Sequence, residues 1–225
     1  MREALPLAED PSQETLICVS WHTSKVQSVE DILSKEYLVA SPGSPSGEQM
    51  IANVLNALLG AKVRAISGYP GGNEMNLAMQ RGEVDGRCGM GWGAVKVTSA
   101  DLIKSKELKV LLQTSIDKHP DLLDVPNAYD MVKTDSDRQA LALLFASQKV
   151  GRPFIGPPDM PADRKAALRQ AFNDTMVDPG FIAGAEKIKL DLQPITGEQL
   201  ELILKTAYAT PTAIIDRTVK IVQSK

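Results

Sequence analysis

The chain has 225 residues, and its 25 Lys and Arg against 28 Asp and Glu residues give a formal net charge of −3. This near balance, with no run of five like charges and only 4% aromatic residues, argues against a nucleic-acid partner. No apolar run reaches the roughly 18 residues that cross a bilayer, so we expect one large globular domain or two small lobes.

The first 15 residues, MREALPLAEDPSQET, carry charges throughout and contain no apolar segment, which predicts that no signal peptide is present. The two cysteines, Cys18 and Cys88, form no C-x-x-C pair, so neither a zinc site nor a thioredoxin-type motif is expected. We expect two buried free thiols. A single disulfide is the alternative, which an oxidising compartment would permit.

The first half of the chain alternates short apolar runs with amphipathic segments. Ser28 is a suitable N-cap for one helix, Asn73 for another, and Gly60 and Gly82 are natural helix ends. This order predicts an α/β fold with a parallel sheet. The expected strands are 16–21, 37–41, 62–67, a short one within 83–93, and 106–114, and the expected helices are 29–36, 50–60 and 73–82.

The second half is richer in helix and in proline. The stretch 150–158, VGRPFIGPP, contains three prolines and predicts a strand that passes into an extended loop. Thr196 and Gln199 have the spacing of a capping box, which predicts a helix start there. The expected helices are 136–149, 161–179, 180–190 and one or two within 196–223, with a short strand at 192–196.

Few residues suggest metal or covalent chemistry. His22 and His119 have no Glu or Cys at metal-ligand spacing, so we expect neither a metal nor a cofactor. A Cys88–His22 pair stays open as a nucleophilic alternative, because such pairs are spatial rather than sequential. The GMGWG segment at 89–93 resembles a dinucleotide loop in glycine content only, and we predict no helix after it.

Two loops, SPGSPSGEQ and GYPGGN, share a design, because each follows a predicted strand and opens a predicted helix. In parallel α/β folds, ligands bind outside the carboxyl ends of strands, at helix N-termini. Hydroxyls of Ser41, Ser44 and Ser46 could hold a carboxylate. Bare backbone at Gly71 and Gly72, with Asn73, could hold another polar group. The alternative is that both loops are ordinary capped helix starts.

Each side chain near these loops can be interpreted in two ways. Asp85 could contact a ligand or cap a turn before a glycine. Tyr69 and Trp92 could cover the apolar part of a ligand or simply pack. No strongly basic cluster faces these loops apart from Arg64 and Arg87, so a small organic anion would be held by neutral donors and helix dipoles.

An ordered set of motifs resembles the substrate-binding proteins of tripartite tricarboxylate transporters, the Bug receptors. The likeness rests on VQSVEDI, SPGSPSG, GYPGGN, RGEVDG, HPDLLDVPN and the C-terminal GRPFIGPPDMPADRKAALRQAFNDTMVDPGF, and it spans about residues 15–205. The resemblance implies a type II periplasmic binding protein: two α/β lobes with parallel-rich sheets and flanking helices, closing on a small carboxylate without catalysis, metal or cofactor.

The resemblance also implies a division of roles along the chain. Residues 22–114 would form the second lobe, which carries the ligand loops, and residues 1–21 with 115–225 would form the first lobe. The ligand-binding residues would be Ser41, Ser44, Ser46, Gly68, Tyr69, Gly71, Gly72, Asn73 and Asp85. By family, the protein would act in the periplasm with the membrane subunits of a transporter.

The family pattern begins with a strand, loop and helix that have no counterpart here, so we expect an incomplete first lobe. Such a lobe would expose apolar surface and sheet edges, which favours association with a second copy. Two other functions stay open. One is an intracellular ligand-sensing domain of the same fold, and the other is a small hydrolase with Cys88 as nucleophile.

Overall fold

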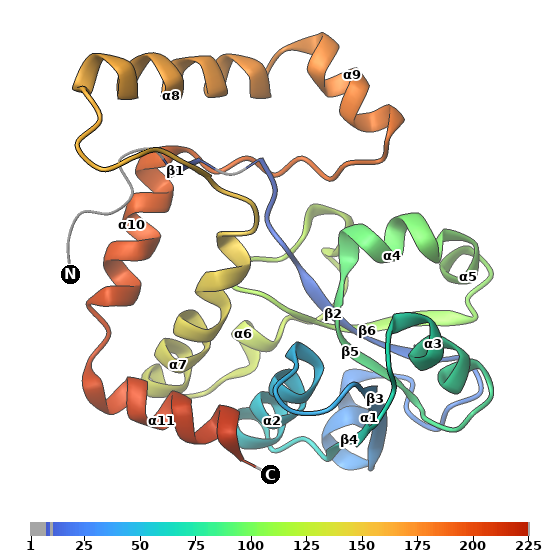
Figure 1. The fold of residues 1–225 in the computed structure, drawn as a ribbon. Helices are drawn as coiled ribbons and strands as arrows, with labels where there is room; N and C mark the ends of the chain where they lie inside the picture. The colour runs from blue at the N-terminus through green and yellow to red at the C-terminus, as the bar shows by residue number, and fades with distance from the viewer. Residues whose placement is uncertain (1–7, 10, 225) are drawn as a thin grey trace. The chain divides into compact units, whose positions relative to one another are not determined.

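The computed structural model describes residues 8, 9 and 11–224, and the chain divides into two compact units. The sheet unit comprises Thr15–Leu144 with Pro211–Lys225, and the helical unit comprises Met1–Glu14 with Phe145–Thr210. Figure 1 traces the chain through both. The assignment of 22–114 to a second lobe, and of 1–21 with 115–225 to a first, stays a prediction.

A five-stranded mixed sheet forms the centre of the sheet unit, in the order β4-β3-β5-β2-β6 (Figure 1). β3 lies parallel to β4 and β5, whereas β2 lies antiparallel to β5 and β6. The predicted parallel sheet is therefore wrong for β2 alone. β2 and β3 follow each other in the chain but are not neighbours in the sheet, because β2 lies between β5 and β6. The rule for crossovers between adjacent parallel strands therefore does not determine the direction of β2. The strands are β2 (Leu16–Trp21), β3 (Tyr37–Ser41), β4 (Val63–Ser67), β5 (Gly86–Gly91) and β6 (Leu108–Thr114).

Helices cover this sheet and bury its apolar side chains. α3 and α4 share a core cluster with alternate residues of β2, among them Ile17 and Val19, while α2 contacts β4, β5 and α11. This alternation follows from the two-residue period of a strand. The helices of this unit are α1 (Val29–Ser34), α2 (Gly47–Leu59), α3 (Gly72–Gln80), α4 (Trp92–Thr98), α5 (Ala100–Lys104), α6 (Ala128–Met131), α7 (Asp135–Phe145, whose last residue lies in the helical unit) and α11 (Thr212–Gln223).

Local signals located most helix ends correctly. Ser28 caps α1 by accepting from Asp31 N–H, and α2 ends at Gly60 with φ 67°, as predicted. Asn73 is not the N-cap of α3, because Gly71 occupies that position. The glycine-rich segment is itself strand β5, and α4 follows it directly, so the prediction that no helix follows is wrong.

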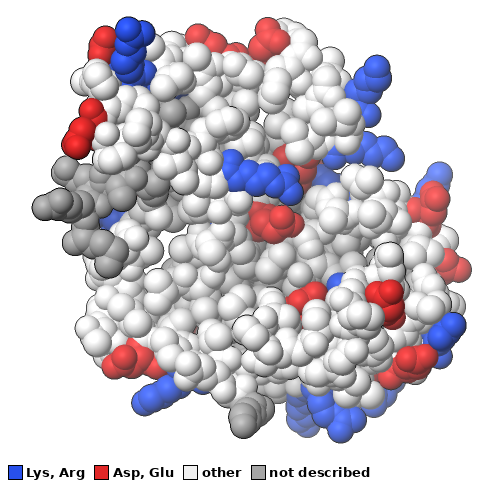
Figure 2. Space-filling view, viewed as in Figure 1, with Lys and Arg blue, Asp and Glu red and all other residues white. Residues whose placement is uncertain are grey.

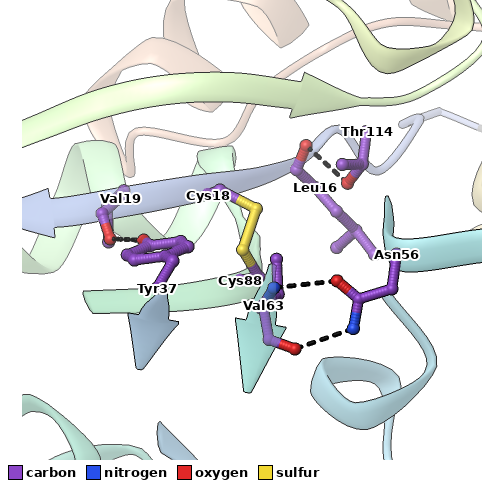
Figure 3. The surroundings of a disulfide bond; sticks show 8 residues. All are labelled: Leu16, Cys18, Val19, Tyr37, Asn56, Val63, Cys88 and Thr114. Atoms are coloured by element: carbon purple, nitrogen blue, oxygen red, sulfur yellow. Dashed lines mark hydrogen bonds between the residues drawn. A yellow bond between two sulfur atoms is a disulfide. The ribbon is translucent and has the colours of Figure 1, made fainter. Parts of the chain in front are cut away.

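Cys18 on β2 and Cys88 on β5 form a disulfide within the buried sheet (Figure 3). The two residues are paired across the antiparallel strands, with Cα atoms 4.0 Å apart. The expectation of two free thiols is therefore wrong, because local sequence does not reveal that β2 and β5 are neighbours. Beside the disulfide, the Tyr37 hydroxyl donates to Val19 O at 2.5 Å (Figure 3), and burial raises the pKa of Tyr37.

The C-terminal helix α11 packs within the sheet unit. Asn53 on α2 donates from Nδ2 to the carbonyls of Val222 and Ser224, at 3.1 and 2.7 Å, and so caps the helix end. Arg217 pairs with Asp137 on α7. The break between α10 and α11 falls at Pro211, which disfavours helical backbone at the residue before it.

The helical unit has a small core centred on Ile195 and Leu200. Thr196 and Gln199 form the predicted capping box at the start of α10. Residues 192–196 are mostly irregular, so the predicted strand there is wrong; Pro194 removes a strand donor. The unit contains the antiparallel pair β1 (Ala8–Glu9) and β7 (Phe154–Ile155) with α8 (Ala162–Met176), α9 (Pro179–Lys187) and α10 (Gly197–Tyr208).

Candidate ligand site

The two loops singled out in the sequence meet at one edge of the sheet. Ser41 ends β3 and Ser67 ends β4, and these two residues pair in the parallel ladder. We call residues 41–46 the serine loop and residues 68–71 the glycine loop. A hydrogen bond from Tyr69 N–H to Ser41 O, at 3.4 Å, joins the two loops, so the structure brings both helix starts together.

The serine loop uses two of its three hydroxyls internally. Ser41 is fully buried, and its Oγ accepts from Gly43 N–H at 3.1 Å and lies 3.2 Å from Ser46 Oγ. Ser46 Oγ also accepts from Gln49 N–H at 3.2 Å, which caps α2. Ser44 is exposed, and no partner of its hydroxyl is seen within the described part of the chain. Ser44 is therefore the hydroxyl best placed to meet a ligand.

The glycine loop leaves its helix start uncapped. Gly71 is the N-cap of α3 and offers no side-chain acceptor, while Gly72 and Asn73 in the first turn are exposed. The first N–H groups of a helix have no partner inside the helix, so these amides are available to an anion. Gly68 has φ 112°, a backbone conformation that favours glycine. The Tyr69 ring packs partly against the core.

Arg87 connects the two helix starts from β5. Its Nη1 donates to Gly72 O at 3.2 Å and to Asn76 Oδ1 at 2.7 Å, and its Nη2 lies 3.5 Å from Glu48 Oε1. Arg87 is only 6% exposed, and this burial lowers the pKa of its guanidinium, against the opposing effect of Glu48. The sequence places the basic residue Arg87 near the loops, but no local pattern predicts that it binds the starts of both helices.

A bulge in β5 brings the first turn of α2 close to the sheet. The register between β2 and β5 shifts next to Gly89, which has φ 84°. A Cβ on Gly89 would lie 3.2 Å from the Glu48 Cα, so a side chain here would push against α2. The glycines of this strand therefore permit close packing of backbone, and none of them forms a phosphate loop.

Asp85 lies at the opposite end of the sheet from the loops. Its carboxylate accepts from Ser24 Oγ at 2.8 Å and from Leu38 N–H, near the start of β3, at 2.9 Å. It lines a cavity of about 190 Å³ together with Trp21 and Met79. Arg64 pairs with Glu36 at 3.3 Å, and it also lines the larger cavity that Ser44 and Ser67 line. The structure therefore does not bring Asp85 together with the other predicted site residues.

A larger cavity lies beside β4 and the serine loop. Its volume is about 550 Å³, and Ser44 and Ser67 line it together with polar residues of α2 and the end of α11. Several of its amides are occupied within the protein; Asn56, for instance, exchanges two hydrogen bonds with the Val63 backbone (Figure 3). Ser44 thus lies where this cavity meets the serine loop.

The described residues contain no cluster of three side chains suited to a metal ion. His119 is buried, and its Nδ1 accepts from Asp121 N–H at 3.0 Å. The disulfide removes the free thiol of Cys88, so the hydrolase alternative lacks its nucleophile. On the face shown in Figure 2, acidic and basic side chains are interspersed. Within residues 8, 9 and 11–224, none of the helices is long and apolar enough to span a membrane.

The comparisons with known proteins support a fold assignment. The sequence matches no protein-family model and none of the curated proteins. A TctC solute binding protein from Polaromonas superposes with a TM-score of 0.66 at 14% identity, over 96% of this chain and 70% of that chain. The chain therefore has the fold of a TctC-type periplasmic binding protein.

Two further solved structures contain ligands. The R. palustris protein Rpa4515 with adipate matches with a TM-score of 0.58 at 14% identity, over 97% of this chain and 68% of that chain. MatC from Rhodopseudomonas palustris with bound malate matches with a TM-score of 0.50 at 16% identity, over 98% of this chain and 68% of that chain. The fold likeness thus extends over nearly all of this chain.

Proposed function

We propose that this chain is a non-catalytic solute-binding receptor of the tripartite tricarboxylate type, and that its ligand is a small organic carboxylate. The observation that carries the proposal is the pairing of Ser41 with Ser67, which puts both loops and two helix starts at one sheet edge. A likeness of fold to binding proteins that hold adipate and malate supports the ligand class.

In the proposed site the residues have different tasks. Ser44 and the first-turn amides of Gly72 and Asn73 would donate to the carboxylate, and neutral donors of this kind commonly act together with bridging water. Ser41, Ser46 and the positive-φ Gly68 would shape the loops. Tyr69 and Gly71 would complete the wall, whereas Asp85 would act only at the far end of the sheet.

The receptor would work by closing two lobes around the ligand, as periplasmic binding proteins do. We place it in the periplasm, where the membrane subunits of a transporter would receive the ligand. The Cys18–Cys88 disulfide supports this placement over the intracellular sensor, since disulfides persist in oxidising compartments.

Association of two copies through exposed apolar side chains of the helical unit is part of the same proposal. Phe154 on β7 and Leu168 on α8 are 59% and 46% exposed, and none of the α8 residues is buried. A second copy could cover these apolar side chains. Light scattering after size exclusion should then give a dimer mass, whereas a monomer mass at high concentration excludes this association.

A ligand screen by thermal shift tests the receptor function directly. Mono-, di- and tricarboxylates of two to six carbons are added to the full chain, with sodium chloride at matched ionic strength as control. A ligand at 100 times its Kd should stabilise the protein by about 2.7 kcal/mol. If none of these acids raises Tm or binds in calorimetry, the receptor proposal is rejected.

A further inference from the structure

β4 forms one edge of the five-stranded sheet, so its backbone pairs with β3 on one side only. An edge strand presents its remaining N–H and C=O groups outward. Tyr37 N–H on β3 donates to Lys62 O at 2.9 Å, so the even-numbered residues of this stretch direct their polar backbone groups toward β3. The outward backbone groups therefore belong to Val63, Ala65 and Ser67.

Asn56 on α2 occupies the first of these outward positions. Its Oδ1 accepts from Val63 N–H at 2.8 Å, and its Nδ2 donates to Val63 O at 2.7 Å (Figure 3). This side-chain amide thus makes the two hydrogen bonds that a residue of a neighbouring strand would make. For the outward groups of Ala65 and Ser67, the described residues provide no partner. These two residues lie about 7 Å apart along the strand, so they present two consecutive pairing positions.

Both pairing positions open into the cavity of about 550 Å³. Gln49, Asn53 and Asn56 recur at spacings of four and three residues, so one polar face of α2 also lines this cavity. The end of α11 lines it as well, through Gln223 and Ser224, and α11 packs against α2 (Figure 1). The edge of β4 therefore lies in a recess between these helices.

The recess determines which kind of partner reaches this edge. A second copy of this chain would present its own β4 between the same helices, so two recessed edges cannot approach each other. A single extended polypeptide is narrow enough, and its alternating N–H and C=O groups match those of an edge strand. Among the described residues that line the cavity, Arg64 alone is charged, and its side chain is 61% exposed. An acidic partner segment gains from this charge, whereas a basic one is repelled.

We propose that the free edge of β4 binds an extended segment of a partner protein, which adds a further strand to the sheet beside Ala65 and Ser67. The segment carries an acidic side chain next to Arg64. Main-chain hydrogen bonds supply the affinity, and Arg64 supplies the preference for an acidic partner. This inference goes beyond the receptor function and does not depend on it, because no group at the start of α3 takes part.

Amide hydrogen exchange of the free protein tests the edge itself. The N–H groups of Arg64 and Ile66 face β3 and should exchange slowly, whereas those of Ala65 and Ser67 should exchange at least about tenfold faster. NMR on the full chain at low concentration resolves these four amides. If Ala65 and Ser67 are protected as strongly as their neighbours, this chain covers its own edge and the proposal is rejected. Protection that appears only at higher protein concentration identifies a second copy as the occupant and also rejects it.

A set of blocked hexapeptides then serves as the probe. Each alternates threonine and valine, which favour strands, and carries glutamate, glutamine or lysine at one central position. The glutamate peptide should bind with a Kd of about 1 mM or lower, and at least about tenfold more tightly than the lysine peptide. It should also slow the exchange of the Ala65 and Ser67 amides. Methylation of alternate peptide nitrogens leaves one strand edge free and should preserve binding, whereas methylation of every nitrogen should abolish it.

Variants on β4 identify the groups responsible. Ala65→Pro removes one outward N–H and keeps the pairing with β3, because proline is tolerated where the N–H of an edge strand faces outward. It should weaken binding of the glutamate peptide at least about tenfold, whereas Ala65→Ser, the matched control, keeps the N–H and the affinity. Arg64→Met should remove the preference for glutamate over lysine and leave the glutamine peptide unaffected. If Ala65→Pro folds poorly, the methylated peptides test the same hydrogen bonds on the wild-type chain.

The remaining outcomes decide against the proposal. Binding that survives full methylation of the peptide, or that Ala65→Pro leaves unchanged, would show that side chains rather than backbone groups are recognised. If no peptide protects Ala65 and Ser67 at millimolar concentration, the edge does not accept an extended segment. Neither result bears on the receptor function, which the carboxylate screen tests separately.

Discussion

The serine loop and the glycine loop each connect a parallel strand to the helix that follows it, yet they differ in whether their polar groups are hydrogen-bonded within the protein. The serine loop has three hydroxyls and uses two of them to order itself and to cap α2. The glycine loop has no side-chain cap and leaves the first amides of α3 exposed. The number of polar side chains in a loop is therefore a poor guide to the donors that it offers a ligand.

Arg87 links the two loops, because it contacts the start of α2 through Glu48 and the start of α3 through Gly72. Replacing it by methionine, Arg87→Met, should lower stability and ligand affinity more than a change at either loop. The variant leaves Glu48 and the Gly72 carbonyl without their cationic partner. Breaking a buried ion pair in this way costs about 3–5 kcal/mol of stability. Urea unfolding should show this loss, and carboxylate binding should disappear with it.

Two further variants show whether Arg87 acts through its geometry. Arg64→Met removes an exposed pair with Glu36 and should cost less than about 1 kcal/mol. Arg87→Lys keeps the charge but not the planar fork, so it should restore only part of the stability and binding. If Arg87→Lys behaves like wild type, a point charge suffices and the two-helix contact is unimportant.

The disulfide fixes the sheet from which both loops depart. Replacing both cysteines, in a Cys18→Ala/Cys88→Ala variant, should lower the free energy of unfolding by about 2–4 kcal/mol, because the bond closes a long stretch of chain. Ligand affinity should change little, since the contacts of Arg87 are independent of the sulfurs. A large loss of affinity at full folding would show that the loops depend on this cross-link.

Gly71→Ser converts the glycine loop into a copy of the serine loop. Gly71 has φ −171°, which any residue adopts, and only the flexible end of Glu74 lies near the new Cβ. A serine cap should raise stability by a few tenths of a kcal/mol, since glycine is only slightly worse. It should weaken carboxylate binding by about 1.5–3 kcal/mol, because the new hydroxyl occupies an amide that the ligand needs.

Gly184→Ser on α9 is the control for this exchange, because a Cβ there meets nothing within 4 Å. It should leave ligand affinity unchanged. Opposite signs for stability and affinity in Gly71→Ser distinguish a ligand-binding amide from a merely structural one. If both fall together, the variant disturbs the loop, and the uncapped amides lose their proposed role.

The sequence predicted those parts of the fold that local patterns control. Strands β3 and β4, the helices that follow them, the Ser28 cap and the Thr196–Gln199 capping box all depend on residues within a few positions of one another. The resemblance then predicts that both loops contribute to the ligand site. Their proximity follows from parallel pairing, because the carboxyl ends of parallel strands share one edge.

What the sequence missed depends on long-range pairing. The reversed direction of β2 and the Cys18–Cys88 bond both follow from the placement of β2 between β5 and β6. The partners of Arg87 lie on two separate helices, so no residue spacing along the chain predicts these contacts. The RGEVDG motif predicts that Asp85 lies with the loops, whereas its hydrogen bond from Leu38 N–H places it near the start of β3.

The smallest expected effect concerns the serine loop. Ser46→Ala removes the cap of α2 and should cost about 1 kcal/mol of stability. Ser28→Ala is its matched control, because Ser28 caps α1 in the same way and lies outside both loops. If the Ser46 hydroxyl serves the helix alone, calorimetry should find the same ligand affinity in both variants. A selective loss of affinity in Ser46→Ala would show that the serine loop also donates to the ligand, and the contrast between the two loops would then fail.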